Sequence, residues 1–270
     1  MREFKMRLSQ SPRPLPPGRW AMSQRWNDLL FAHWPVPASS ICGMLPEGLQ
    51  PDTHDGSAWI GVVPFWMDRI RLRGVPPVPG TRNFPELNLR TYVRDQYTGA
   101  EGVYFFSLDG GNPLAAAVAR MFYHLPYYWA EMRHDQQSER EFAVYSRRRL
   151  SSREVIFKAR YRGLGPTRKL AESRPGSLEH FLTERYCLFA ENSAGELVQA
   201  PVHHMPWPLE DAEADIERND LPAAVGIELP ADKPPILHYS RRQAVYLWPI
   251  TLAHPLRTRQ RIPAQAMPSV

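Results

Sequence analysis

The chain has 270 residues, of which 43% are hydrophobic, 11% aromatic and 23% charged, and this composition excludes an intrinsically disordered protein. The formal net charge of +5 comes from basic residues that are interleaved with acids, apart from Arg147 to Arg149, so we expect no specific nucleic-acid partner. The N-terminus has no apolar signal segment, and no stretch as long as a membrane span is free of charge and proline. We therefore expect a cytoplasmic protein with no membrane partner.

Cysteine and proline usage narrows the class further. Two cysteines, Cys42 and Cys187, are too few for a disulfide framework, and no Cys/His cluster has zinc spacing, so we expect no metal and no cofactor. The 28 prolines are spread between short apolar runs, which favours many turns and short strands. We expect a flexible Pro/Arg-rich arm over 1–19, one domain over 20–254 and a polar tail over 255–270.

The first predicted element is a short amphipathic helix in "WAMSQRWNDLLFAHW", ending before Pro35. Five of its residues fall near one helical stripe: Trp20, Trp26, Leu29, Leu30 and His33. Further along, the dipeptide Asp55-Gly56 is a typical two-residue turn, and it predicts a hairpin between the extended runs on either side.

The rest of the chain alternates between strand and helix patterns. Strands are predicted over 85–95, 102–109, 141–149, 153–162, 186–191, 196–204 and 242–250. Helices are predicted over 112–123, 176–183 and 208–218; "SLEHF" offers Ser177 as N-cap, and "PLEDAEADIE" places acids in the first turns of its helix. The pattern predicts a β-rich α+β domain with short helices inserted between strands, most simply closed as a barrel.

The stretch "NFPELNLRTYV" carries an unusual polar face. If it is extended, one face holds Glu86, Asn88, Arg90 and Tyr92, and the other holds Leu87, Leu89, Thr91 and Val93. Such a polar face is compatible with two environments, bulk water or an internal cavity that holds a ligand.

Seven segments together resemble a known family. They are "LPEGLQPDTHDGSAWIG", "NFPELNLRTYV", "GVYFFSLD", "ARMFYHLPYYWAEM", "GSLEHFLTERY", "VHHMPWPL" and "HYS". In this order they look like the YqjF-like family of uncharacterised bacterial proteins, the domain of unknown function 2071, which is similar at the superfamily level to acetoacetate decarboxylase. The resemblance implies a closed, largely antiparallel β-barrel around a solvent-poor cavity, and it favours the inward direction for the polar face.

The resemblance does not extend to the nucleophile of those decarboxylases. Their Schiff-base lysine directly follows a proline and has a second lysine beside it, whereas matching "AVARMFYHLPYYWA" puts Pro126 at the proline and Tyr127 and Tyr128 at the lysines. A Schiff base needs a primary amine, which tyrosine lacks. Lys158 is the one lysine inside a predicted strand, and its neighbours on that strand face, Glu154 and Arg160, indicate a solvated surface.

The candidate ligand-binding residues are Glu86, Asn88, Arg90, Tyr92, Tyr127, His204 and His238. Arg90 offers a fork of donors that suits a carboxylate, and its charge needs an anion, which either Glu86 or a ligand could supply. His204 and His238 are each either wall residues of a pocket or ordinary structural histidines. We therefore expect a protein that binds, and in one version converts, a small carboxylate- or carbonyl-bearing compound without a Schiff base. The alternative is a non-catalytic structural or ligand-sensing module in which Glu86 and Arg90 neutralise each other.

Overall fold

The computed structural model describes residues 14–76, 83–167 and 174–254. The predicted tail over 255–270, residues 1–13 of the predicted arm, and the lysines Lys5 and Lys169 lie outside these ranges. In chain order the elements are β1 (Met22–Val36), α2 (Ser39–Cys42), β2 (Leu49–Pro51), β3 (Ala58–Leu72), β4 (Phe84–Asp95), β5 (Glu101–Gly110), α3 (Pro113–Tyr123), β6 (Tyr127–Gln136), β7 (Glu141–Arg148), β8 (Ile156–Gly163), α4 (Leu178–Thr183), β9 (Cys187–Glu191), β10 (Leu197–His204), β11 (Leu209–Asn219), α5 (Leu221–Ala224), β12 (Ile236–Leu247) and β13 (Thr251–Leu252). None of the helices in the described ranges has the length and apolar character that a membrane crossing requires.

Nine strands form a closed ring in the order β1-β3-β4-β5-β6-β7-β8-β11-β12. The pairings are antiparallel except that β5 pairs in parallel with β6, and α3 is the crossover between those two strands. The prediction of a β-rich α+β barrel with short inserted helices is confirmed, and the ring is mixed rather than purely antiparallel.

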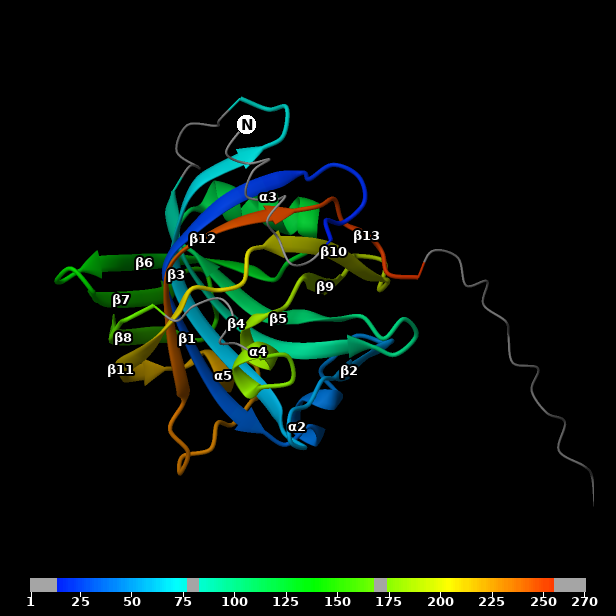
Figure 1. The fold of residues 1–270 in the computed structure, drawn as a ribbon. Coiled ribbons are helices and arrows are strands. Elements are labelled where there is room, and N and C mark those ends of the chain that lie inside the picture. The colour runs from blue at the N-terminus through cyan, green and yellow to red at the C-terminus, as the bar shows by residue number, and fades with distance from the viewer. Residues whose placement is uncertain (1–13, 77–82, 168–173, 255–270) are drawn as a thin grey trace, which may run out of the picture.

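Two further strands close a second ring against the first. β9 and β10 pair with each other, β9 pairs in parallel with β5, and β10 pairs with β12. The strands β12, β1, β3, β4 and β5 therefore belong to both rings. In Figure 1, β6, β7, β8 and β11 lie on one side of these shared strands, and β9, β10 and α4 lie on the other.

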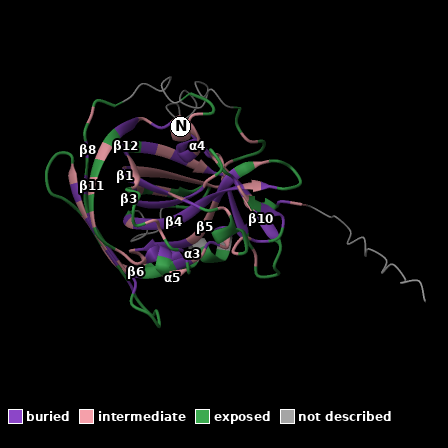
Figure 2. Cartoon of the chain, turned by 90° about the horizontal axis from the view of Figure 1, so that it is seen from below, coloured by how far each residue is buried: buried purple, intermediate pink, exposed green. Residues whose placement is uncertain are grey.

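The central parts of β1, β3 and β4 are buried on both faces. Along β1, Leu30 and Ala32 pack in the apolar core of the nine-strand ring. Phe31 and His33 face the opposite side, where Phe31 contacts Trp207 and His33 contacts Tyr92. Figure 2 shows β1, β3 and β4 in the buried interior and exposed residues on loops and outer strands such as β8 and β11. The shared strands therefore have one face in each of two separate interiors.

The predicted helix between Trp20 and Trp34 is wrong, because this segment is the strand β1. A strand buried on both faces shows no alternation of polar and apolar residues, and its continuous apolar run can mimic a helical stripe. Asp28 adds to the irregularity: its φ of 53° lies within a register shift of the β1–β3 pairing between Asn27 and Ala32.

The predicted helix over 208–218 is also wrong, because this segment is the strand β11. Its residues alternate strictly, with Ala212, Ala214 and Ile216 packed against the core of the nine-strand ring. The acids between them face solvent, where Glu213 and Glu217 form ion pairs with residues of β8. Alternation of small apolar residues with acids fits a half-buried strand as well as a helix start, and the strand pairing decided the outcome.

The other predicted elements differ less from the structure. The helices over 112–123 and 176–183 are confirmed as α3 and α4, with Asn112 and Ser177 as their N-caps. The Asp55-Gly56 turn is present, but the run before it forms β2, which pairs with β4, so no hairpin of β2 with β3 exists among the described strands. The last predicted strand begins earlier, at Ile236, and β6 had no predicted counterpart.

Candidate functional site

The polar face of β4 is buried. Relative exposure is 4% for Glu86, 4% for Asn88, 8% for Arg90 and 0% for Tyr92. This face does not line the nine-strand ring, whose interior is apolar and receives Leu87 and other alternate residues of β4. It faces the second ring instead, where Tyr92 packs with residues of α4, β9 and β10.

Arg90 lies in a row of three residues across neighbouring strands. His33 of β1 pairs with Gly61 of β3, and Gly61 pairs with Arg90 of β4. A Cβ added at Gly61 would lie 3.1 Å from His33 Cδ2 and 3.3 Å from Arg90 Cγ, so a side chain there would crowd both neighbours. The missing side chain lets His33 and Arg90 approach each other over the sheet.

The guanidinium of Arg90 has aromatic neighbours and no carboxylate partner. Its Cζ lies 5.4 Å from the ring centroid of Phe31 and 5.8 Å from that of Tyr92, and Nη2 lies 3.5 Å from the Tyr92 hydroxyl. Within the described ranges no Asp or Glu forms an ion pair with Arg90, and its buried Nε has no hydrogen-bond partner. We call Arg90, His33, Phe31, Tyr92 and Asn88 the Arg90 cluster.

Glu86 does not neutralise Arg90. Four residues along an extended strand separate their Cα atoms by about 13 Å, which is too far for a direct pair. Glu86 instead accepts hydrogen bonds from the Tyr127 hydroxyl and from the Asn88 side chain, and burial raises its pKa to about 7 despite both. The internally neutralised pair of Glu86 and Arg90, one of the two predicted alternatives, is thus not found in the described structure.

Tyr127 takes the place where the family resemblance would put the Schiff-base lysine. It is the first residue of β6, and its buried hydroxyl donates to Glu86 Oε2. Its neighbour Tyr128 is exposed, with the guanidinium of Arg148 at 4.1 Å over its ring. Lys158 is exposed on β8 and forms an ion pair with Glu217 at 2.7 Å. Tyr127 and Tyr128, which stand where the decarboxylases have lysines, supply no amine, and Lys158 does not bring one to the Arg90 cluster.

The contacts of Tyr92 fix the protonation of His33. The Tyr92 hydroxyl donates to the carbonyl of Leu182 at 2.7 Å and also lies 2.6 Å from His33 Nε2. Because a hydroxyl has one hydrogen and a carbonyl only accepts, both contacts are satisfied when His33 Nε2 carries the proton and donates it. Burial, followed by the charges of Arg90 and His238, holds the pKa of His33 well below its ordinary value, so the ring is neutral and Nδ1 is an acceptor.

His33 was not among the predicted site residues, because the sequence placed it on a helix. The signal that could have found His33 is its spacing of two residues from Phe31, because in a strand these two side chains share a face. In the structure their rings are stacked with centroids 6.0 Å apart.

His204 and His238 lie at the edges of the Arg90 cluster. His204 Nδ1 lies 2.8 Å from the carbonyl of Met205 and Nε2 3.2 Å from that of Arg185, and burial lowers its pKa. His238 Nε2 lies 3.4 Å from a carboxylate oxygen of Glu179 in α4. Both imidazoles thus have contacts within the protein, as ordinary structural histidines would, and a wall role for either one stays a prediction.

A second buried arginine, Arg148, shows how this fold satisfies such a charge. Arg148 Nε donates to Asp109 Oδ1 at 2.6 Å and Nη2 donates to Ser107 Oγ at 2.6 Å. The other oxygen of Asp109 accepts from Ser146 Oγ at 2.8 Å. This group is complete, whereas the Arg90 cluster has unpaired atoms, and the contrast marks the Arg90 cluster as the candidate site.

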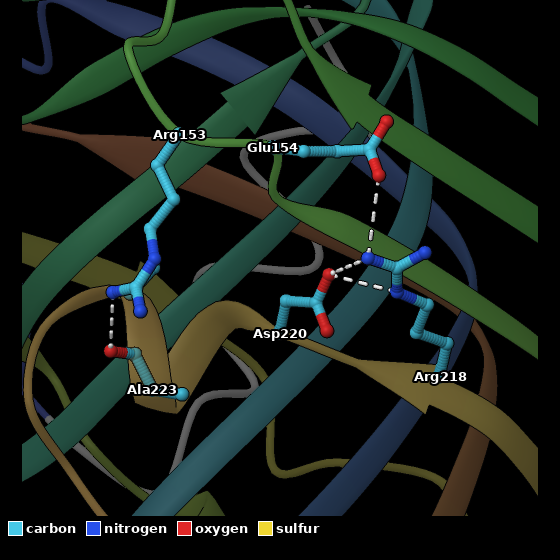
Figure 3. A pocket seen from close by; sticks show the side chains of 6 residues that line it. Arg153, Glu154, Arg218, Asp220 and Ala223 are labelled. Atoms are coloured by element: carbon cyan, nitrogen blue, oxygen red, sulfur yellow. Dashed lines mark hydrogen bonds and ion pairs between the residues drawn. The ribbon is translucent and has the colours of Figure 1, made fainter.

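A surface pocket of about 240 Å³ lies elsewhere, beside α5. Figure 3 shows Arg218 directed at Asp220 and Glu154, and Arg153 directed at the carbonyl of Ala223. The charged groups of this pocket already have partners in the protein, so they do not call for a ligand. Nor do three or more His, Cys, Asp or Glu side chains gather as a metal site anywhere in the described ranges.

The sequence matches a known protein family over most of its length. The model of the DUF2071 family, described as an uncharacterized conserved protein, matches residues 23–244. The chain belongs to the DUF2071 family. It is 43% identical over 245 residues to the protein YqjF of Bacillus subtilis, covering 90% of this chain and 97% of YqjF.

Solved structures similar to this DUF2071 protein share the acetoacetate decarboxylase-like fold. An acetoacetate decarboxylase-like enzyme from Sphingomonas wittichii matches with a TM-score of 0.59 and 12% identity, over 90% of this chain and 98% of that one. Acetoacetate decarboxylase from Legionella pneumophila matches with a TM-score of 0.57 and 13% identity, over 92% and 94%. The enduracididine biosynthesis enzyme MppR, in its complex with pyruvate, matches with a TM-score of 0.57 and 13% identity, over 90% and 93%. At these identities the likeness establishes the fold alone.

Proposed function

We propose that this protein binds a small organic carboxylate at Arg90, and that it does so without a Schiff base. The observation that carries the proposal is the buried guanidinium of Arg90, which has no ion-pair partner among the described residues and an unpaired Nε. A ligand carboxylate would supply the missing anion through charge-assisted hydrogen bonds to the planar guanidinium fork.

The energetics favour a ligand over an empty site. Burying a charge without a partner costs several kcal/mol, and aromatic faces such as those of Phe31 and Tyr92 offset only part of that cost. Binding of an anion relieves this penalty, so part of the binding free energy is already stored in the free protein. MppR, which has the same fold, was solved in complex with pyruvate, and this supports a small keto or hydroxy acid as the size of ligand to test.

A conversion of the bound ligand would have to use groups other than lysine. Glu86 and the Tyr127 hydroxyl form a hydrogen-bonded pair, and the raised pKa of about 7 lets Glu86 either hold or release a proton near neutral pH. Asn88 lies between Glu86 and Arg90 on the same strand face and hydrogen-bonds Glu86. A ligand held by Arg90 would therefore lie on the same face of β4 as a group able to exchange protons.

The proposal is tested by titrating pyruvate, propanoate and acetoacetate into the wild-type protein and two arginine variants, with calorimetry as the measurement. Arg90→Met removes the guanidinium, and Arg71→Met, on the exposed end of β3, is the matched control. We expect Arg71→Met to bind like the wild type and Arg90→Met to bind about 10- to 100-fold more weakly, as the loss of a charge-assisted hydrogen bond predicts. Equal binding by Arg90→Met and the wild type, or no binding of any of the three acids by the wild type, would refute the proposal.

A further inference from the structure

Part of the interior of the second ring is covered by residues 177–184, which contain α4 and which we call the α4 segment. Its Leu182 is 0% exposed, and its Phe181 packs against the same apolar cluster as Tyr92. Among the described residues, the backbone hydrogen bonds of the α4 segment stay within residues 174–185, and none joins it to a strand. Side-chain contacts therefore hold the α4 segment on the barrel.

Both ends of the α4 segment are anchored. Just before it, the carbonyl of Gly176 lies 3.1 Å from His54 Nε2. Just after it, Arg185 Nη1 donates to Asp52 Oδ2 at 2.7 Å, and both of these side chains are buried. Asp52 is itself fixed to β4, because its backbone N–H donates to the carbonyl of Tyr92 at 2.9 Å. A buried ion pair is costly to break, so we expect the end at Arg185 to stay in place when the α4 segment moves.

The middle of the α4 segment rests on Tyr92. The Tyr92 hydroxyl donates to the carbonyl of Leu182 at 2.7 Å, and the ring centroids of Phe181 and Tyr92 are 5.3 Å apart. The same hydroxyl lies 3.5 Å from Arg90 Nη2, so Tyr92 links the α4 segment to the guanidinium. Movement of α4 away from the barrel would remove the Leu182 carbonyl and the Phe181 ring from Tyr92. Water would then reach the phenol and the guanidinium beside it.

The burial of Arg90 makes such a movement necessary for a ligand to enter. Arg90 is 8% exposed, its Nε is buried, and the ring centroids of Phe31 and Tyr92 lie 5.4 and 5.8 Å from its Cζ. An anion from solvent therefore reaches the guanidinium only after a covering group has moved. Phe31 and Tyr92 lie on β1 and β4, which have paired strands on both sides, whereas the α4 segment has no backbone hydrogen bond to a described strand. Segments held in this way open at a lower free energy than the whole fold.

We propose that the α4 segment is a lid that opens and closes over the Arg90 cluster, with the Leu182 carbonyl and the Phe181 ring as the contacts that keep it closed. As an account of ligand entry, this inference rests on the proposed function, because it assumes that a carboxylate binds Arg90. The opening itself is a property of the free chain and is measured without a ligand.

Hydrogen exchange followed by mass spectrometry tests the opening. Peptides that span α4 are compared with peptides from the buried part of β3, over a series of low urea concentrations. We expect the α4 amides to exchange about tenfold or more faster than those of β3, and with little dependence on urea, because local opening exposes little surface. Equal exchange of the two sets, with the same dependence on urea, would mean that α4 opens only when the whole protein unfolds, and it would overturn the proposal.

A phenylalanine variant tests what keeps the lid closed. Phe181→Ala removes the ring that packs on Tyr92 and should raise the exchange of the α4 amides about tenfold relative to those of β3. Phe106→Ala is the matched control, because Phe106 is also half-buried and contacts one tyrosine ring, that of Tyr104 at 5.6 Å, but packs against the core of the nine-strand ring. It should leave the ratio of α4 to β3 exchange at its wild-type value. The same ratio in Phe181→Ala as in the wild type would overturn the assignment of Phe181.

Chemical labelling tests whether the opening uncovers Arg90. Phenylglyoxal modifies accessible arginine side chains, and Arg148, which is as buried as Arg90, is the control within the same chain. We expect Phe181→Ala to raise the rate of Arg90 modification by the same factor as the α4 exchange and to leave the rate at Arg148 unchanged, with the sites assigned by peptide mass mapping. Faster α4 exchange without faster modification of Arg90 would overturn the lid, since α4 would then cover some other part of the interior.

The outcomes separate the lid from the proposed function. Excess propanoate should slow the modification of Arg90 in the wild type, because a bound carboxylate would cover the guanidinium. Absence of this protection, with α4 exchange and Arg90 modification still rising together in Phe181→Ala, would refute carboxylate binding and support the lid. Arg90-dependent binding of carboxylates by a protein whose α4 exchanges only on global unfolding would support the proposed function and overturn the lid. The exchange comparison of α4 with β3 needs only the wild-type protein, so it decides even if Phe181→Ala fails to fold.

Discussion

The two buried arginines should respond in opposite directions to the same substitution. Arg90 has no carboxylate partner among the described residues, whereas Arg148 is held by Asp109 and Ser107. Methionine has a similar aliphatic length and no charge, so Arg90→Met and Arg148→Met each remove a guanidinium while keeping much of the side-chain volume.

The magnitudes follow from what each substitution leaves behind. Arg148→Met leaves the Asp109 carboxylate buried and unpaired, and removing one partner of a buried pair costs about 3 to 5 kcal/mol. Arg90→Met leaves no acid behind and removes an uncompensated buried charge worth several kcal/mol of penalty. The substitution also loses the cation–π contacts of Arg90 with the Phe31 and Tyr92 rings, and this loss offsets about 1 to 4 kcal/mol of the stabilisation. We expect Arg90→Met to change the free energy of unfolding by between zero and about 3 kcal/mol, in the stabilising direction.

Urea unfolding at pH 7, followed by tryptophan fluorescence, measures both effects, provided the slope with denaturant is the same for all variants. The double variant Asp109→Asn/Arg148→Met serves as the control, because it removes both charges and should recover part of the loss of Arg148→Met. If Arg90→Met instead destabilised the protein by as much as Arg148→Met, Arg90 would have an anionic partner in the folded chain, and the reasoning that made it a ligand site would fail.

Three further predictions address the neighbouring groups. The folded-state pKa of Glu86 is raised from 4.5 to about 7. The contribution of Glu86 to stability is therefore complete below pH 4.5 and falls by about 3 kcal/mol as the pH rises through 7. Glu86→Gln should remove this fall, which urea unfolding measured between pH 5 and 8 would show. Tyr92→Phe strands the Leu182 carbonyl and the His33 donor and should lower the unfolding free energy by about 2 to 4 kcal/mol, whereas a loss below about 0.5 kcal/mol would mean that neither bond is formed. Borohydride added with acetoacetate should trap no covalent adduct, and a stable mass increase mapped to Lys158 would contradict the absence of a Schiff base.

The barrel and the buried polar face of β4 were accessible from the sequence, because each depended on local patterns. Alternation placed Glu86, Asn88, Arg90 and Tyr92 on one face, and the family resemblance favoured burial of that face. Which interior the face lines was not accessible, because the second ring depends on the pairing of β9 with β5 and of β10 with β12, over long sequence separations.

The errors have two physical causes, the burial of a strand on both faces and the pairing of strands that are distant in sequence. The β1 segment lost its alternation because both faces are buried, and this concealed His33, which the strand pairing brings next to Arg90 across Gly61. The alternative in which Glu86 pairs with Arg90 is not found either, because residues that share a strand face are not automatically close enough to touch. Partners on neighbouring strands, such as Tyr127 for Glu86, are set by register, which no local pattern fixes.

The sharing of strands by two rings has a consequence for how this family can diversify. On β4 the even-numbered positions from 86 to 92 face one interior, while Leu87 and Leu89 pack in the other. A substitution at 88 or 90 therefore changes the chemistry of one compartment without altering the side chains that hold the other together. Natural selection, or a combinatorial library restricted to those even positions, could explore new ligand preferences while the apolar core of the nine-strand ring keeps the chain folded.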